Sequence, residues 1–165
     1  MGWWPHRMRL TPTYERHSMS AEDNKTIIRR VYDEAINNGN FIIVNESFTD
    51  DYIYRSPGSP EFHGPDGFKQ LVTMYRTAFP DLHIQLDELI VEGDTVVSRY
   101  TACGTQLGEL MGVPPTGKYV TGTGVVISHF RGGKAADEWE LIDIFGVMQQ
   151  LAVIPMPEPA VAAAH

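Results

Sequence analysis

The stretch LHIQLDELIVEGDTVVSRYTACGTQ, residues 82–106, decides the fold because its apolar residues follow a different period from those before it. Apolar and polar residues alternate over residues 82–86, which predicts a β-strand with one buried face. The alternation slips at Asp87, where we expect a bulge, and Gly93 lies in the turn to a second strand. The middle of the chain is therefore predicted to be an antiparallel hairpin.

Before residue 82 the apolar residues follow the helical period. A capping box at residues 20–23 predicts a helix that ends at Gly39, and Pro65 at a first helical position predicts another up to Phe79. The remaining predicted elements are a brief helix within 41–48, strands at 51–55, 119–131 and 135–144, and a short helix at 145–151. This order predicts an α+β fold, a curved antiparallel sheet with helices on one face and a pocket between them.

The composition indicates one acidic domain. The 165 residues are 42% hydrophobic and 21% charged, which allows one hydrophobic core. The net charge of -8 argues against nucleic acid as a partner, and no apolar run approaches the roughly 20 residues that span a membrane. Cys103 is the single cysteine and cannot form an internal disulfide, so we expect a cytoplasmic protein.

Three segments are expected along the chain. Residues 1–19 carry three arginines against one glutamate and are expected to be a disordered or mis-started N-terminal extension, the alternative being a basic arm that docks on an acidic surface. Residues 20–154 are expected to form the single domain. Residues 155–165, with their alternating prolines, are expected to form an exposed Pro/Ala-rich tail.

The motifs that accompany most cofactor chemistry are missing. The six histidines have no metal-site spacing, and the sequence has no P-loop, dinucleotide fingerprint or serine nucleophile elbow. We therefore expect no metal site and no cofactor. An enzyme with this sequence would work with carboxylate, imidazole and phenol groups.

Six short motifs occur in an order that is known from one family. They are AFPDLH (78–83), GD with VVSRYTACGT (93–105), GVPPTGK (112–118), GGK (132–134), EWELID (138–143) and MQQL (148–151). Together they resemble the SnoaL-like polyketide cyclases and predicted ester cyclases of the nuclear-transport-factor-2-like superfamily. The resemblance covers residues 24–152, nearly the whole expected domain.

The resemblance implies a cone-shaped α+β fold in which helices and a bent sheet enclose a deep apolar pocket, often in a homodimer or tetramer. It also implies an intramolecular aldol condensation without metal or cofactor, with a carboxylate of the last strand as general acid and base. An ungapped alignment places that carboxylate, an aspartate in the family, at Glu140. Two histidines seen in the family fall on Val126 and Gln106 here, so this chain departs from the pattern at three positions.

The direction of the Glu140 side chain depends on the turn at 132–134. A three-residue loop places Val126 opposite Glu140, whereas a two-residue loop places Val126 opposite Trp139 and reverses the faces. Periodicity alone favours Trp139 and Leu141 on the buried face, whereas the resemblance places Glu140 there. Both can hold only if a partner subunit covers the outer face. We predict that Glu140 faces the pocket and that Asp143 supports it or caps the last helix.

We predict two catalytic residues and a wider set of ligand contacts. The catalytic pair is Glu140 and Asp143. If Arg99 is buried in its apolar strand it needs a carboxylate partner, for which Glu140 and Asp143 are the candidates. The predicted ligand contacts are Tyr54, His63, Arg99, Gln106, Val126, Glu138 and Trp139.

Three hypotheses about function follow. The first is a cofactor-free enzyme that cyclises or isomerises a small apolar carbonyl compound by general acid–base chemistry. The alternative is a non-catalytic protein that binds a hydrophobic ligand in the same pocket, because fold alone does not determine function. The third is a scaffold that would expose an apolar patch on the outer face of the sheet.

Overall fold

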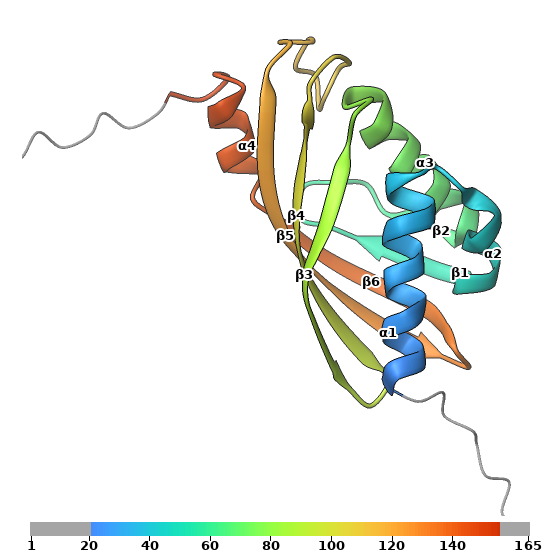
Figure 1. Ribbon diagram of the computed structural model, residues 1–165. Helices are drawn as coiled ribbons and strands as arrows, with labels where there is room; N and C mark the ends of the chain where they lie inside the picture. Colours follow the sequence, from blue (N-terminus) through green and yellow to red (C-terminus); the bar gives the residue numbers. More distant parts are fainter. Residues whose placement is uncertain (1–20, 156–165) are drawn as a thin grey trace, which may run out of the picture.

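The computed structural model describes residues 21–155, and six strands form one sheet in the order β2-β1-β6-β5-β4-β3 (Figure 1). The strands are β1 (Phe48–Arg55), β2 (Phe62–His63), β3 (His83–Glu92), β4 (Thr95–Thr105), β5 (Tyr119–Arg131) and β6 (Lys134–Ile142). All neighbouring strands are antiparallel except β1, which lies parallel to β6. The predicted α+β fold is confirmed, with this one parallel pair as an unpredicted feature.

The helices are α1 (Ala21–Arg30), its continuation η1 (Val31–Asn37), η2 (Phe41–Ile43), α2 (Val44–Ser47), α3 (Gly64–Ala78) and α4 (Ile144–Gln150). Helices α1 to α3 lie on one side of the curved sheet, and α4 lies near the end of the sheet where β5 begins (Figure 1). The predicted stop at Gly39 is confirmed, since this residue has a φ of +69°. Segment η1 is a π-helix, a local widening that the sequence pattern does not show.

The main core lies between these helices and the sheet. Phe48 and Tyr52 of β1 pack against Phe68 of α3, and the rings of Phe48 and Phe68 have centroids 4.4 Å apart. A second apolar cluster joins the end of α3 to α4 through Phe79, Val120 and Val147. The two clusters fix the helices at both ends of the inner face of the sheet.

The register of β5 on β6 combines the two alternatives that the sequence leaves open. The loop has two residues, because Arg131 pairs directly with Lys134. A bulge then inserts Ala136 into β6, and beyond it Val126 lies opposite Glu140. The three-residue loop is therefore wrong, but the register expected from it is present over most of the hairpin.

This register decides which side chains of β6 face the helices. Glu138 and Glu140 are buried, whereas the side chains between and after them, Trp139 and Leu141, are 40% and 53% exposed on the other face. The interpretation from periodicity, with Trp139 and Leu141 inward, is therefore wrong. Polar hydroxyl partners on the inner face, described below, make the burial of two carboxylates tolerable.

The expected N-terminal extension and, apart from Pro155, the expected C-terminal tail lie outside the described residues, as does the predicted helix cap at Ser20. Within residues 21–155, no helix has the length and apolar character needed to cross a membrane.

Candidate active site

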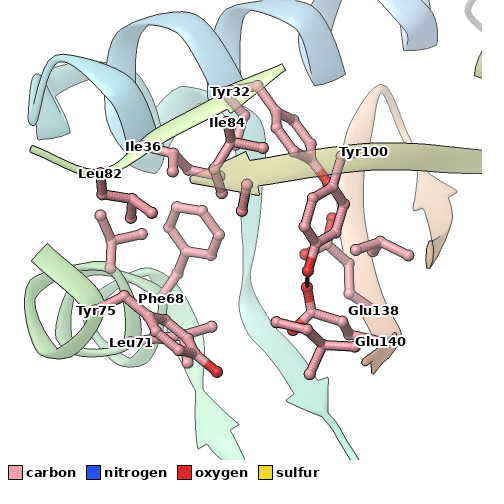
Figure 2. A pocket seen from close by; sticks show the side chains of 15 residues that line it. Tyr32, Ile36, Phe68, Leu71, Tyr75, Leu82, Ile84, Tyr100, Glu138 and Glu140 are labelled. Atoms are coloured by element: carbon pink, nitrogen blue, oxygen red, sulfur yellow. Dashed lines mark hydrogen bonds between the residues drawn. The ribbon is translucent and has the colours of Figure 1, made fainter. Parts of the chain in front are cut away.

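Glu140 lies on the inner face of β6, where its carboxylate accepts hydrogen bonds from two phenols. Figure 2 shows the one from Tyr100. Tyr54 of β1 donates its hydroxyl hydrogen bond to Oε2, and Tyr100 of β4 donates to Oε1 at 2.5 Å. Only 9% of Glu140 is exposed. Donors from strands on opposite sides of β6 therefore fix the orientation of this carboxylate within the sheet.

Tyr100 reaches Glu140 because the strand between them carries a glycine. Tyr100 lies opposite Gly124 of β5, and its ring crosses that residue toward β6. A Cβ atom at Gly124 would lie 2.4 Å from Cζ of the Tyr100 ring, far inside van der Waals contact. Glycine is thus required here for the phenol to reach the carboxylate.

Glu138, two residues earlier on the same face, has its own pair of donors. Tyr52 of β1 donates to its Oε2 at 2.7 Å, and Ser128 of β5 donates to its Oε1 at 2.7 Å. Glu138 is 7% exposed. The site therefore contains two buried carboxylates, each bound by two neutral hydroxyl groups.

Burial raises the pKa of both glutamates. The pKa of Glu138 rises from 4.5 to about 7, chiefly because burial disfavours its charge, and the hydrogen bonds from Ser128 and Tyr52 oppose that rise. Burial also raises the pKa of Glu140, against hydrogen bonds from Tyr100 and Tyr54. In the part of the chain that the structure describes, no ion pair joins a lysine, arginine or histidine to either carboxylate.

The tyrosines that contact Glu140 remain donors at neutral pH. Burial raises the pKa of Tyr54 and Tyr100 well above the usual value, and the negative charge of Glu140 raises it further. Tyr75 of α3 lies near the same carboxylate, and burial raises its pKa to about 12. Each of these phenols therefore carries its proton.

Both glutamates line an apolar cavity of about 90 Å³ between the helices and the sheet (Figure 2). Most of its wall is hydrocarbon, with Phe68, Leu71 and Val72 contributed by α3. The full lining consists of Val31, Tyr32, Ile36, Phe68, Leu71, Val72, Tyr75, Leu82, Ile84, Tyr100, Ala102, Val126, Glu138, Glu140 and Ile142. This arrangement presents two carboxyl groups to an otherwise apolar ligand space.

A second apolar cavity of about 50 Å³ continues toward α4. The two cavities have a common wall, formed by Tyr75, Leu82, Ala102 and Ile142. The two cavities therefore adjoin at these four side chains.

The structure brings four of the predicted residues to the site or its edge. Val126 and Glu138 line the first cavity, as Glu140 does, and Tyr54 contacts Glu140 directly. Asp143 lies at the end of β6, where its carboxylate accepts a hydrogen bond of 2.9 Å from the Gly146 amide as the cap of α4. The capping role predicted for Asp143 is confirmed, and it leaves this side chain outside both cavities.

Arg99 requires a correction. Its side chain is half-exposed on the outer face and forms ion pairs with Asp87 at 2.9 Å and Glu88 at 3.5 Å. These partners lie at the bulge in β3, whose position was predicted at Asp87. The predicted pairing of a buried Arg99 with Glu140 or Asp143 is therefore wrong.

Gln106 is buried, but its side chain binds the backbone of the following loop and does not face a ligand space. Its amide nitrogen donates to the carbonyl oxygens of Val113 and Pro114 at 3.1 and 3.2 Å. Its Oε1 accepts from the amide and hydroxyl of Thr116. With its hydrogen-bonding groups used in this way, Gln106 lines neither cavity.

His63 and Trp139 also lie away from the cavities. The His63 side chain is 63% exposed and lies 3.5 Å from a carboxylate oxygen of Glu61. Trp139 lies on the outer face, because the bulge at Ala136 turns its neighbours Glu138 and Glu140 inward. Neither residue contributes to the site that the structure forms.

Sequence reasoning missed most of the hydroxyl groups, namely Tyr52, Tyr100 and Ser128. Each sits at a regular inward position of its strand, where an aromatic or small residue is expected as ordinary core. One signal was present, the glycines at 122 and 124 within a strand pattern, because such glycines mark a close approach by another group. In residues 21–155 there is no cluster of three His, Cys, Asp or Glu side chains that could hold a metal ion.

Comparison with known proteins gives a consistent picture. The family model described as SnoaL-like polyketide cyclase matches residues 26–151. Aklanonic acid methyl ester cyclase DnrD of Streptomyces peucetius is 30% identical over 138 residues, which are 81% of this chain and 92% of that protein. The nogalonic acid methyl ester cyclase of Streptomyces nogalater is 31% identical over 120 residues, covering 71% of this chain and 89% of that protein.

The solved structures agree in fold. TsrD from Streptomyces laurentii superposes with a TM-score of 0.74 at 25% identity, over 82% of this chain and 99% of that one. The helices and the sheet that enclose the cavity are therefore shared with proteins of known structure.

Proposed function

Because this chain belongs to the SnoaL-like polyketide cyclase family, we propose that it closes a ring in a polyketide methyl ester by an aldol-type reaction. The resemblance to polyketide ester cyclases, predicted from six motifs, is confirmed by the family match. The proposed substrate class is that of the relatives, whose names specify aklanonic and nogalonic acid methyl esters. A methyl ester contains a carbonyl group, as the predicted substrate does.

One observation carries the proposal, the buried Glu140 carboxylate at the wall of an apolar cavity. Removal of a proton next to a carbonyl needs a base whose pKa is raised toward the working pH, and burial raises the pKa of Glu140. Tyr54 and Tyr100 hold both oxygens of that base in place. The apolar wall holds the substrate folded, so that the enolate carbon and the attacked carbonyl meet.

The reaction moves protons and one carbon–carbon bond, so it needs no redox cofactor. The departures from the family pattern are tolerated in this scheme. Glu140 replaces an aspartate, and its longer side chain is anchored by two phenols. Val126, where the family has a histidine, adds apolar wall opposite Glu140.

The size of the substrate class requires more space than the two cavities provide as they stand. Pockets that hold drug-sized ligands commonly measure about 300 Å³ or more, whereas the first cavity measures about 90 Å³. We expect the ester to displace Tyr75 and Leu82 and to extend toward α4.

The outer face of the sheet supports the predicted homodimer. The side chains of three neighbouring strands form one apolar patch there. Trp139 and Leu141 of β6 lie opposite Ile127 and Val125 of β5. Ile127 in turn lies opposite Val97 of β4. Burial of such a patch in a second copy of the chain would remove it from water. A homodimer, and a cytoplasmic location, are proposed on this and on the single Cys103.

Incubation with aklanonic acid methyl ester and with nogalonic acid methyl ester tests the proposal. Ring closure by addition leaves the mass unchanged, so the product is expected as an isomer with a new retention time in liquid chromatography–mass spectrometry. Glu140→Gln should abolish this isomer, and the matched control Glu92→Gln, an exposed strand position, should retain it. If both esters bind to the wild-type protein but neither forms an isomer, the chain is instead the non-catalytic binding protein.

A further inference from the structure

The inner face of β6 presents two carboxyl groups to one cavity, although a single base is enough to form an enolate. Glu138 and Glu140 are separated by one residue, which in a strand corresponds to about 6.6 Å between their Cα atoms. Both line the first cavity. An aldol reaction needs a second proton transfer, to the oxygen of the attacked carbonyl, and Glu138 is placed to supply it.

The groups around Glu138 and Glu140 favour a state in which one of the two carboxyl groups is protonated and the other is ionised. The titratable side chains that face the pair are Tyr32, Tyr52, Tyr54, Tyr75 and Tyr100, while Asp137 lies next to Glu138 on the outer face of β6, where it contacts His129. The tyrosines are neutral at pH 7, and Asp137 adds a further negative charge. Since no cation of the described chain pairs with either glutamate, two ionised carboxylates would repel each other in an apolar wall.

The donors distinguish the two glutamates. Glu140 accepts hydrogen bonds from two phenols, which are stronger donors than an alcohol and stabilise the ionised form. Glu138 accepts from one phenol and from the Ser128 hydroxyl, and that alcohol can equally accept a hydrogen bond from a protonated carboxyl group. The heavy-atom geometry at Glu138 therefore suits the acid, and that at Glu140 suits the base.

We propose that the two glutamates divide the acid–base work, Glu140 acting as the base and Glu138 as the acid of the ring closure. This rests on the proposed function of the site. The Glu140 carboxylate takes the proton from the carbon next to one carbonyl, and the resulting enolate carbon forms a bond to the second carbonyl carbon. The electron pair of that C=O bond moves to its oxygen, which takes the proton of Glu138. Return of a proton from Glu140 to Glu138 restores the starting state.

Glu138→Gln and Glu140→Gln separate the two roles when the reaction runs in D₂O. Glu140→Gln should stop both the uptake of deuterium into aklanonic acid methyl ester and ring closure. Glu138→Gln should slow ring closure about 100-fold or more, because the acid is lost. Its base Glu140 is still present, so the unreacted ester should take up deuterium faster than it does with Glu140→Gln. Equal deuteration with the two variants would overturn the division of roles, and Glu92→Gln is again the matched control.

A second variant leaves both glutamates in place. The Ser128 hydrogen bond lowers the pKa of Glu138, so Ser128→Ala should move the alkaline limb of the cyclisation rate to higher pH. A purely structural role of Ser128 would lower the rate without moving that limb, and this result would count against an acid at Glu138.

Infrared spectroscopy reports the proton on Glu138 without any turnover. The wild-type protein near pH 6 should show a carboxylic acid band that is absent from Glu138→Gln and present in Glu92→Gln. Turnover without this band would overturn the assignment of the acid and leave the proposed function standing. Absence of turnover by the wild-type protein would overturn the proposed function and with it the division of roles.

Discussion

Replacing Glu138 by glutamine should change how the stability of the protein depends on pH. Burial raises the pKa of Glu138 in the folded protein from 4.5 to about 7, whereas the unfolded chain keeps the ordinary value. Below pH 4.5 the carboxyl group is protonated in both states. As the pH rises, the unfolded state loses the proton first, so the contribution of Glu138 to stability is lost progressively up to about pH 7.

The magnitude follows from the two values. At about 1.36 kcal/mol per pH unit, the difference corresponds to about 3 kcal/mol of unfolding free energy. Glutamine is neutral at every pH and nearly isosteric, so the variant should escape this loss. The stability of Glu138→Gln relative to the wild-type protein should therefore increase by about 3 kcal/mol between about pH 4.5 and pH 7.5.

Urea unfolding at several pH values measures the difference in unfolding free energy between Glu138→Gln and the wild-type protein. The hydrogen bonds lost in the variant shift this difference by a constant amount, so the test is how the difference changes with pH. The exposed Glu92→Gln should follow the wild-type curve. If the difference between Glu138→Gln and the wild-type protein stayed constant over this range, Glu138 would titrate as an ordinary carboxyl group and the electrostatic reasoning for the site would be refuted.

Three further changes test other parts of the structure. Gly124→Ala places a Cβ atom 2.4 Å from the Tyr100 ring and should displace its hydroxyl from the site; we expect about a 100-fold loss of ester cyclisation, measured by chromatography. Asp143→Ala removes the carboxylate that accepts from the Gly146 amide and should lower the unfolding free energy by about 1 kcal/mol in urea. Leu141→Lys places a charge in the outer apolar patch and should convert the proposed homodimer to a monomer in light scattering.

Each of these variants has a control or a contrary outcome. Thr123→Ala changes the exposed neighbour of Gly124 on β5 and leaves the space of the Tyr100 ring free, so cyclisation should persist. Unchanged cyclisation in Gly124→Ala would show that the Tyr100 hydrogen bond is dispensable. Stability unaffected by Asp143→Ala would contradict the capping role, and a wild-type monomer would contradict the dimer.

Local patterns in the sequence were enough to predict most of the elements, although not the short strand β2 or the π-helix η1. The switch from helical to strand period at residue 82, the stop at Gly39 and the bulge at Asp87 depend on neighbouring residues alone, and all three are present in the structure. The cap of α4 by Asp143 is equally local. Such features could be predicted because backbone conformation and short-range hydrogen bonds determine them.

The site itself depends on pairings that no local pattern contains. The bulge at Ala136 sets the face of Glu140, and nothing in its residue type marks it. Arg99 looked buried in an apolar strand, yet the bulge across from it brings Asp87 to the outer face and gives it a partner in solvent. Family resemblance supplied Glu140, but the partners of its neighbour Glu138 became visible only with the sheet assembled.

The parallel pairing of β1 with β6 gives the site an unusual dependence on folding order. Tyr52 and Glu138 are 86 positions apart in the chain, as are Tyr54 and Glu140. The hairpins of β3 to β6 can form from contacts close in sequence, whereas β1 must close a long loop to join them, a step that is entropically slow. A refolding chain should thus acquire most of its sheet before either glutamate gains its β1 tyrosine, and recovery of activity should lag behind recovery of strand content.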